Sequence, residues 1–178
     1  MKMRDAKGFT LIELLIVVAI IGIIAAIAVP GLLRARMSGN EASAIGSLRA
    51  INSGQASYSA SCAAGGYAIT LADLVKAPAG SSQGFISPDL NANGVTKSGY
   101  VVTLAKDGVA GVTDIGTAAA TCNVSAGQPA SSYFAKADPA TPGGTGTRYF
   151  ATDTRGTIFQ KTTAAIANPI PAAETPVQ

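Results

Sequence analysis

The feature that most constrains this chain is an uninterrupted apolar block near its N-terminus. From Leu14 to Val29 the sequence contains no polar side chain. A helix over residues 9–29 rises about 1.5 Å per residue and so spans roughly 30 Å, the thickness of a bilayer core. The block therefore predicts a helix that can anchor the chain in a membrane.

Basic residues lie just ahead of this block, at Lys2, Arg4 and Lys7. Positive charge stays on the cytoplasmic side of a membrane span, so the residues after Pro30 are expected to cross the membrane. The chain is therefore predicted to be a single-pass protein of the cytoplasmic (inner) membrane with an extracytoplasmic domain.

A cleaved secretory signal has the same order of basic, apolar and small residues, with Ala26-Ile27-Ala28 as its cleavage site. Glu13 argues against that interpretation. A carboxylate costs roughly 2.5–3.5 kcal/mol at the centre of a membrane helix, and less near the interface. A segment that is discarded has no reason to carry one.

The segment Gly8-Phe9-Thr10-Leu11-Ile12-Glu13 resembles the processing signal of the type IV pilin and pseudopilin family, and the match extends through the apolar block to Pro30. The resemblance implies that a membrane peptidase cuts after Gly8 and that Phe9, the new N-terminal residue, is methylated. It also implies that subunits polymerise through the apolar helix. Loss of residues 1–8 removes three of the 13 basic and one of the 10 acidic residues, which leaves a mature charge of +1.

Within this resemblance Glu13 is predicted to serve assembly. Its carboxylate lies four residues from the new amine of Phe9, and an opposite charge is strongly favoured in an apolar core. Pairing between subunits would set their axial register. Gly22 and Pro30 interrupt the same helix, so a kink or loosening is expected between them. In the family this stretch can melt on polymerisation, which implies an extensible fibre.

After Pro30 the pattern becomes amphipathic and predicts a nearly continuous helix over residues 9–61. One stripe of this helix holds Leu33, Ala42, Ile45, Leu48, Ile51 and Tyr58, while Arg34, Arg36, Glu41 and Arg49 lie off it. A short helix is expected over 71–76. Strands are expected over 100–105, 132–137, 148–152 and 157–161. The last two flank the turn sequence Asp153-Thr154-Arg155-Gly156 and should form a hairpin.

The predicted fold class is α+β, with a long N-terminal helix packed on a C-terminal antiparallel sheet. We divide the chain into a cleaved leader (1–8), a membrane-spanning or filament-core helix (9–33), a globular domain (34–166) and a flexible, Pro-rich tail (167–178).

The chain has two cysteines, Cys62 and Cys122, and no histidine. They are too far apart for a CxxC motif, and a disulfide is expected if the domain lies outside the cytoplasm. A bond that closes so long a loop contributes about 4 kcal/mol in the chain-entropy estimate. Many members of the resembling family place a disulfide nearer the C-terminus, so the resemblance does not predict this pairing.

Other candidate sites are weak. Asp89, Asn91 and Asn93 match the opening of a calcium loop, but the twelfth position is Tyr100 and not glutamate, so a surface turn explains them better. The sequon at Asn123 is a weak signal for glycosylation. Without histidine or paired carboxylates the sequence predicts no enzyme and no cofactor. The absence of a Lys/Arg cluster predicts no direct nucleic-acid binding.

The resemblance implies a major structural subunit of a type IV pilus, used for adhesion, twitching motility or DNA uptake. Its partners would be further copies of the chain, the prepilin peptidase and methyltransferase, and the assembly machinery in the membrane. The alternatives are a pseudopilin of a type II secretion system, a minor pilin at a filament tip, or, in another class, a non-polymerising membrane-anchored domain that binds a ligand.

Overall fold

The computed structural model describes residues 8–177. The chain divides into two compact units, with the boundary between Arg36 and Met37. The sequence places the corresponding boundary between residues 33 and 34.

The first unit consists of the N-terminal part of helix α1 (Leu11–Ser61) and the residues just before it. All side chains from residue 8 to residue 36 are exposed. An 18-residue window of α1 has a mean hydropathy of 3.1 and none of it is buried, so the helix is long and apolar enough to cross a membrane. In an ordinary globular domain the apolar surface of such a helix would pack against a hydrophobic core, whereas here it is exposed.

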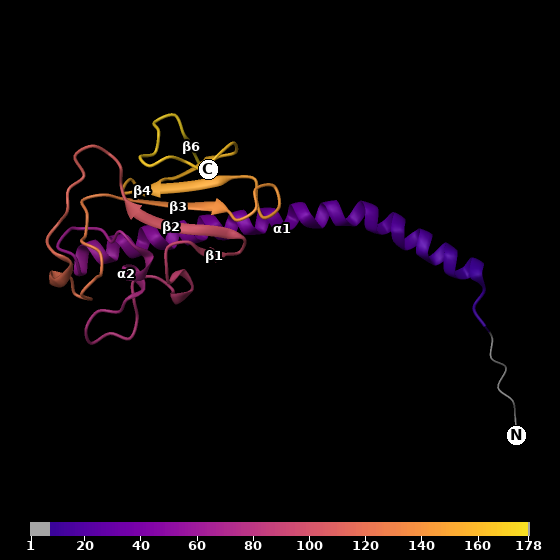
Figure 1. The fold of residues 1–178 in the computed structure, drawn as a ribbon, viewed down its shortest axis with the longest axis horizontal. Coiled ribbons are helices and arrows are strands. Elements are labelled where there is room, and N and C mark those ends of the chain that lie inside the picture. The colour runs from indigo at the N-terminus through magenta and orange to yellow at the C-terminus, as the bar shows by residue number, and fades with distance from the viewer. Residues whose placement is uncertain (1–7, 178) are drawn as a thin grey trace, which may run out of the picture. The chain divides into compact units, whose positions relative to one another are not determined.

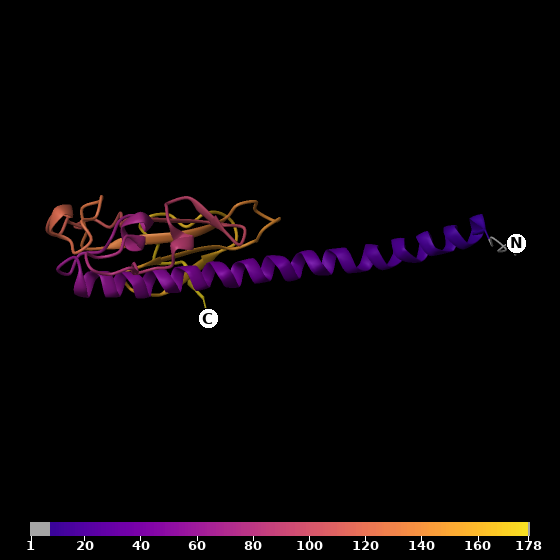
Figure 2. The same ribbon diagram turned by 90° about the horizontal axis from the view of Figure 1, so that it is seen from below.

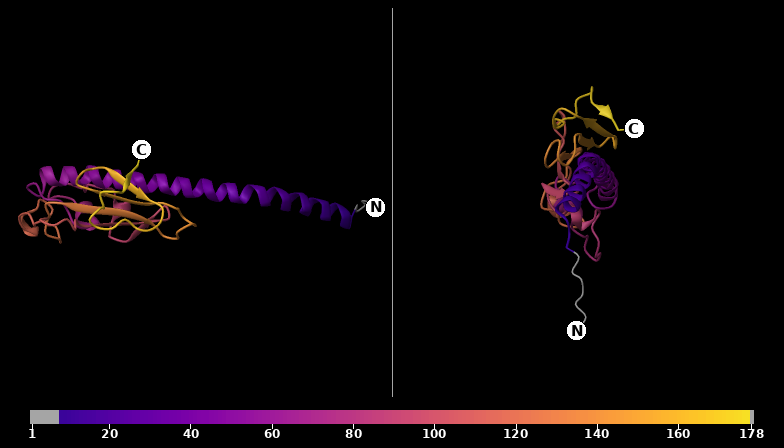
Figure 3. Two further views of the ribbon diagram at one scale, coloured as in Figure 1. Left: turned by 90° about the horizontal axis from the view of Figure 1, so that it is seen from above. Right: turned by 90° about the vertical axis from the view of Figure 1, so that its right-hand side faces the viewer.

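In the second unit, the C-terminal part of α1 packs on an antiparallel sheet (Figures 1, 2 and 3). The side chains of Leu48, Ile51 and Tyr58 are fully buried against the sheet, and Tyr100 and Phe150 meet them from the strands. Spacings of three and seven residues place these helix positions on one face. This face and the inner face of the sheet form the main hydrophobic core.

The buried face of α1 differs from the predicted stripe at one polar and two apolar positions. Leu33 and Ala42 are exposed, whereas Glu41, assigned to the solvent side, is 6% exposed. Glu41 is buried because it finds polar partners in the domain, which a count of apolar side chains cannot show.

The sheet has six strands in the order of the sequence, and every neighbouring pair is antiparallel. The strands are β1 (Val95–Lys97), β2 (Tyr100–Lys106), β3 (Tyr133–Pro139), β4 (Tyr149–Asp153), β5 (Ile158–Lys161) and β6 (Thr175–Pro176). Tyr100, Val102 and Leu104 alternate along β2 and point into the core. The α+β class, the long helix and the antiparallel sheet are thus confirmed, including the hairpin of β4 and β5.

Two short helical segments lie between α1 and β1, namely α2 (Leu71–Val75) and η1 (Pro88–Leu90). A third, η2 (Ala118–Ala120), lies between β2 and β3. The strand β1 was not predicted from the sequence. It pairs with β2 through a tight turn in which Ser98 and Gly99 both have positive φ, 47° and 72°. Such a turn matches the twist of paired strands, so Ser98-Gly99 was an available hairpin signal.

The C-terminal segment differs from the expected flexible tail. β6 pairs with β5, Ile170 is buried, and Lys161 Nζ lies 2.7 Å from Glu174 Oε1. The side chain of Asn168 accepts a hydrogen bond from Gly108 N and donates one to Lys106 O. Proline-rich composition lowers the helix and strand signals, but these specific contacts hold residues 168–176 to the domain.

Candidate assembly site

The N-terminus of α1 is closed by reciprocal hydrogen bonds between Thr10 and Glu13. Thr10 N and Thr10 Oγ1 donate to Glu13 Oε2 at 2.9 and 2.6 Å, and Glu13 N donates to Thr10 Oγ1 at 3.3 Å. Because α1 begins at Leu11, Thr10 is the N-cap residue and Glu13 the third helical residue, the arrangement of a capping box. The pair satisfies N–H groups that a helix start leaves without partners.

This cap is a role of Glu13 that we did not predict, although the spacing Thr10-x-x-Glu13 signals it. The cap uses only one carboxylate oxygen, because both bonds from Thr10 end on Oε2. Oε1 has no hydrogen-bond partner among residues 8–177. Glu13 therefore retains an acceptor that the described residues do not use.

Gly8 and Phe9 precede α1, outside any helix or strand, and both are exposed, Phe9 by 85%. A peptide bond in an exposed segment without regular structure is open to a peptidase. Residues 1–7 of the predicted leader lie outside the described residues. Cleavage after Gly8 and methylation of Phe9 remain predictions.

Gly22 and Pro30 lie within α1, which continues through both. A Cβ added at Gly22 would meet no atom within 4 Å. Pro30 has no N–H, so the carbonyl of Ala26 loses its usual partner within the helix. Loosening of this stretch on polymerisation remains a prediction.

The exposed apolar surface is concentrated at this end of the chain. Of 18 large hydrophobic side chains that are exposed among the described residues, all but Val109 and Val124 lie within residues 9–33. Soluble monomers rarely expose a continuous apolar surface of more than a few hundred Å². This segment therefore needs either a membrane or other protein chains around it.

A polar clamp joins α1 to the loop between β3 and β4. Glu41 Oε1 accepts hydrogen bonds from Thr147 N (2.9 Å), Thr147 Oγ1 (3.0 Å) and Arg148 N (3.2 Å), while Oε2 faces the Arg148 guanidinium. Burial by itself would raise the pKa of this carboxyl, but the bonds from Thr147 and Arg148 hold the pKa below its ordinary value. Asn40 adds a bond from its amide nitrogen to Thr145 O at 2.8 Å.

The predicted disulfide between Cys62 and Cys122 is confirmed. It joins the residue after α1 to the segment that follows η2, and Cys122 N also donates to Cys62 O at 3.1 Å. Next to it the sequon residue Asn123 is 3% exposed. Its amide nitrogen, which a glycan would need, donates instead to Asp73 O (2.7 Å) and Lys76 O (3.0 Å).

Two of the three weak calcium candidates, Asp89 and Asn93, are used in other contacts of the domain. Asp89 Oδ2 lies 2.6 Å from Lys97 Nζ. Asn93 Oδ1 accepts hydrogen bonds from Leu71 N (3.2 Å) and Leu104 N (3.1 Å), so its oxygen faces two donors. Within residues 8–177 no group of three or more His, Cys, Asp or Glu side chains is arranged to hold a metal ion.

These features define the class of chain: an exposed apolar helix with one capped carboxylate near its start, followed by a helix-on-sheet domain. A family model described as the prokaryotic N-terminal methylation motif matches residues 3–29. No solved structure matches the chain.

Three curated relatives are similar in sequence to this chain. The type IV wide pilus major component PilA4 of Thermus thermophilus is 67% identical over 39 residues, 22% of this chain and 30% of the relative. The type IV major pilin protein PilA of Myxococcus xanthus is 48% identical over 52 residues, 29% of this chain and 24% of the relative. The fimbrial protein EcpC of Eikenella corrodens is 39% identical over 115 residues, 58% of this chain and 75% of the relative.

The chain thus spans less than a third of the length of the Thermus and Myxococcus relatives, but three quarters of the Eikenella fimbrial protein. The chain belongs to the type IV pilin family.

Proposed function

We propose that this chain is the major structural subunit of a type IV pilus, which polymerises through its N-terminal helix. The observation that carries the proposal is the exposure of every side chain from residue 8 to residue 36 on a helix that holds a carboxylate, Glu13, near its start. Such a surface is suited to a membrane before assembly and to a bundle of like helices afterwards.

Glu13 supplies the register in this proposal. Cleavage after Gly8 creates an amine on Phe9, and methylation leaves its positive charge in place. In the apolar core of a fibre, the amine of an incoming subunit meets the free Oε1 of Glu13 in the subunit already placed, while Oε2 keeps the bonds from Thr10. One carboxylate thus caps its own helix and pairs with a neighbour.

The proposed route begins in the cytoplasmic membrane, where the prepilin peptidase and methyltransferase act on the precursor. The assembly machinery then moves the subunit into an extracellular filament. Adhesion, twitching motility and DNA uptake are the roles proposed for the filament, and the subunit itself is structural and not catalytic.

Two relatives, from Thermus and Myxococcus, carry the description of a major pilus component or major pilin, which favours the pilus over a pseudopilus. The alternative remains a pseudopilin of a type II secretion system, which forms only a short fibre. A membrane-anchored domain that does not polymerise is the alternative from another class. It does not account for a carboxylate within the anchor.

Electron microscopy of material sheared from the cell surface tests the proposal. An antibody to the domain should label long fibres along their whole length if the chain is the major subunit. Labelling at one end only would indicate a minor pilin. Absence of the chain from sheared fibres, with processed protein retained in the membrane, would contradict the proposal and favour one of the alternatives.

A further inference from the structure

The distribution of ion pairs leaves a specific set of charges without partners. Six salt bridges lie within residues 8–177: Lys97–Asp89, Lys106–Asp114, Lys136–Asp138, Arg148–Glu41, Arg155–Asp153 and Lys161–Glu174. Among the described residues, the carboxylates outside these pairs are Glu13, Asp73 and Asp107, and the cations are Arg34, Arg36, Arg49 and Lys76.

Two of these groups are satisfied within the domain. Asp73 accepts hydrogen bonds from Ala126 N (2.6 Å), Thr70 Oγ1 (2.7 Å) and Gly127 N (3.2 Å). Lys76 Nζ donates to Val124 O at 2.5 Å. With Glu13 assigned to the start of α1, Asp107 is the carboxylate of the globular unit that lacks a cation.

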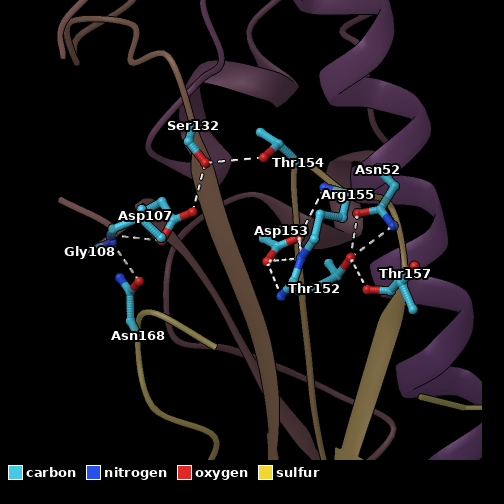
Figure 4. A network of polar contacts seen from close by, with 11 residues as sticks. Asn52, Asp107, Gly108, Ser132, Thr152, Asp153, Thr154, Arg155, Thr157 and Asn168 are labelled. Carbon is cyan, nitrogen blue, oxygen red and sulfur yellow. Dashed lines mark hydrogen bonds and ion pairs between the residues drawn. The ribbon is translucent and has the colours of Figure 1, made fainter. Parts of the chain in front are cut away.

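Asp107 lines a hollow of about 340 Å³ at the end of β2. Its side chain is joined to Ser132, whose hydroxyl donates to Asp107 Oδ2 at 2.7 Å and lies 3.2 Å from Thr154 Oγ1 (Figure 4). Val109 N donates to Oδ1 at 3.1 Å. The residue is 8% exposed and its hydrogen-bond donors are neutral. The pKa of the nearby Arg155 guanidinium is raised by its hydrogen bond to Asp153 and, more weakly, by the charge of Asp107, but its ion pair is with Asp153.

The other charges of this hollow cancel each other. Asp153 is bound by the Arg155 guanidinium through Nε and Nη2, at 2.9 and 2.7 Å from Asp153 Oδ2, and the same guanidinium lies 4.7 Å from the centre of the Phe159 ring. Figure 4 shows this pair beside the Ser132–Thr154 contact. One negative charge, that of Asp107, therefore remains. A buried carboxylate without a cation is costly, and a positively charged donor at the hollow would offset that cost.

The hollow opens at one end of the sheet. Lys106 at the end of β2 is paired with Tyr133, and Asn52 of α1 donates to Gly156 O in the adjacent turn at 3.0 Å. At the other end of the same strands, Tyr100 of β2 is the register partner of Pro139 of β3, and Glu41 of α1 binds Thr147. Along α1, positions 41 to 52 thus run from one end of the sheet to the other.

Arg34 and Arg36 precede Glu41 by seven and five residues in α1. Both belong to the first unit, whereas Asp107 belongs to the second. Both are exposed, and neither forms an ion pair with any residue from 8 to 177. Arg49, in contrast, lies between the two ends. The first unit thus holds two cations without an ion pair, and the second unit holds a carboxylate without one.

We propose that the hollow at Asp107 receives the guanidinium of Arg34 or Arg36 from a second copy of this chain. A contact between two different surfaces of the same subunit is heterologous, and repetition of such a contact builds an open polymer. The inference rests on the proposed filament, because it assigns a contact between the globular unit of one subunit and Arg34 or Arg36 of another, in addition to the contact of the apolar helices. The guanidinium donates to Asp107 while Arg155 remains on Asp153.

Zero-length cross-linking with carbodiimide on isolated fibres tests the contact. The single substitutions Arg34→Lys and Arg36→Lys keep the charge and introduce an amine that carbodiimide can join to a carboxylate. One of the two variants should give a peptide in which residue 34 or 36 is linked to Asp107. The link should be absent from subunits dispersed in detergent and lost on Asp107→Asn. The Lys106–Asp114 pair, at 2.6 Å within one subunit, is an internal positive control.

Fibre yield provides a second measurement. Asp107→Asn should lower fibre mass about tenfold, since a charge-assisted hydrogen bond is worth enough for that change. The matched control Asp114→Asn, on an exposed carboxylate of the same loop, should leave fibre mass at the wild-type level.

The inference is overturned if wild-type chain forms fibres, the Lys106–Asp114 link is found, neither variant links to Asp107, and Asp107→Asn fibres reach wild-type mass. Absence of wild-type chain from any fibre is a different result, since it contradicts the proposed function itself.

Discussion

Glu41 and Arg148 connect the long helix to the sheet through a salt bridge of 2.8 Å between Glu41 Oε2 and Arg148 Nη2. Arg148 also donates from Nη1 to Gln160 Oε1 on β5 at 2.7 Å. The clamp thus ties α1, the start of β4 and β5 together, close to the point where the helix enters the globular unit. Its loss should weaken the attachment of the helix to the domain.

Glu41→Gln should lower the free energy of unfolding of the globular unit by about 2 kcal/mol, because the hydrogen bonds then end on a neutral group and the Arg148 guanidinium loses its counter-ion. Denaturant titration of the full chain in detergent measures it. The control is Asp89→Asn, which breaks the more exposed Lys97–Asp89 pair and should cost at most about 1 kcal/mol. Equal effects of the two substitutions would contradict the clamp.

The same carboxylate predicts a pH dependence. The pKa of Glu41 in the folded chain is below its ordinary value of 4.5, so the unfolded chain binds the proton more readily. The stabilisation is therefore complete above pH 4.5 and is lost as the pH falls through the lower, folded pKa. Thermal unfolding between pH 6 and pH 3 should show a steeper loss of stability for wild type than for Glu41→Gln. Parallel curves would assign the acid sensitivity to other groups.

The Cys62–Cys122 disulfide closes a loop with a sequence separation of 60 residues. By the chain-entropy estimate, the double substitution Cys62→Ala and Cys122→Ala should lower the free energy of unfolding by about 4 kcal/mol. Denaturant unfolding of the full chain measures the change, and reduced wild-type protein should behave like the double variant. A change below about 1 kcal/mol would show that the hydrogen bonds of Asn123 and Cys122 hold this region without the covalent bond.

The mature N-terminus is predicted at Phe9, with a methylated amine. Mass spectrometry of intact subunits and N-terminal peptides from membranes and fibres measures it, and a bulky residue at Gly8 should leave uncut precursor in the membrane. Chains that start after Ala28, or that retain residues 1–8 in fibres, would contradict the prediction.

The long helix, four strands, the β4–β5 hairpin and the disulfide were predictable because each depends on local patterning or on simple counting of residues. The clamp at Glu41 and the hollow at Asp107 were not. In both, a charged side chain is buried by partners more than 20 residues away, namely Arg148 and Ser132. A single sequence carries no direct signal for such pairings. The strand β6 was missed because two residues paired to an edge strand leave no periodicity to detect.

The Thr10–Glu13 cap was predictable from its spacing, and it matters for how Glu13 is tested. Substitution by alanine or valine removes the cap and the charge together. Glutamine is also found at the third position of capping boxes, so Glu13→Gln keeps the cap and removes only the charge. Thr10→Val is the complementary change, since it removes the hydroxyl and keeps the carboxylate.

The most direct measurement is the number of surface fibres on cells in which Glu13→Gln is the only form of this subunit, counted beside the membrane pool of processed subunit. If the carboxylate sets the register by pairing with the amine of Phe9 in a neighbouring subunit, the variant should be processed, inserted and folded like wild type but form few or no fibres. Thr10→Val should retain fibres in much greater number. Wild-type fibre numbers with Glu13→Gln would contradict the charge pairing and leave the cap as the purpose of Glu13.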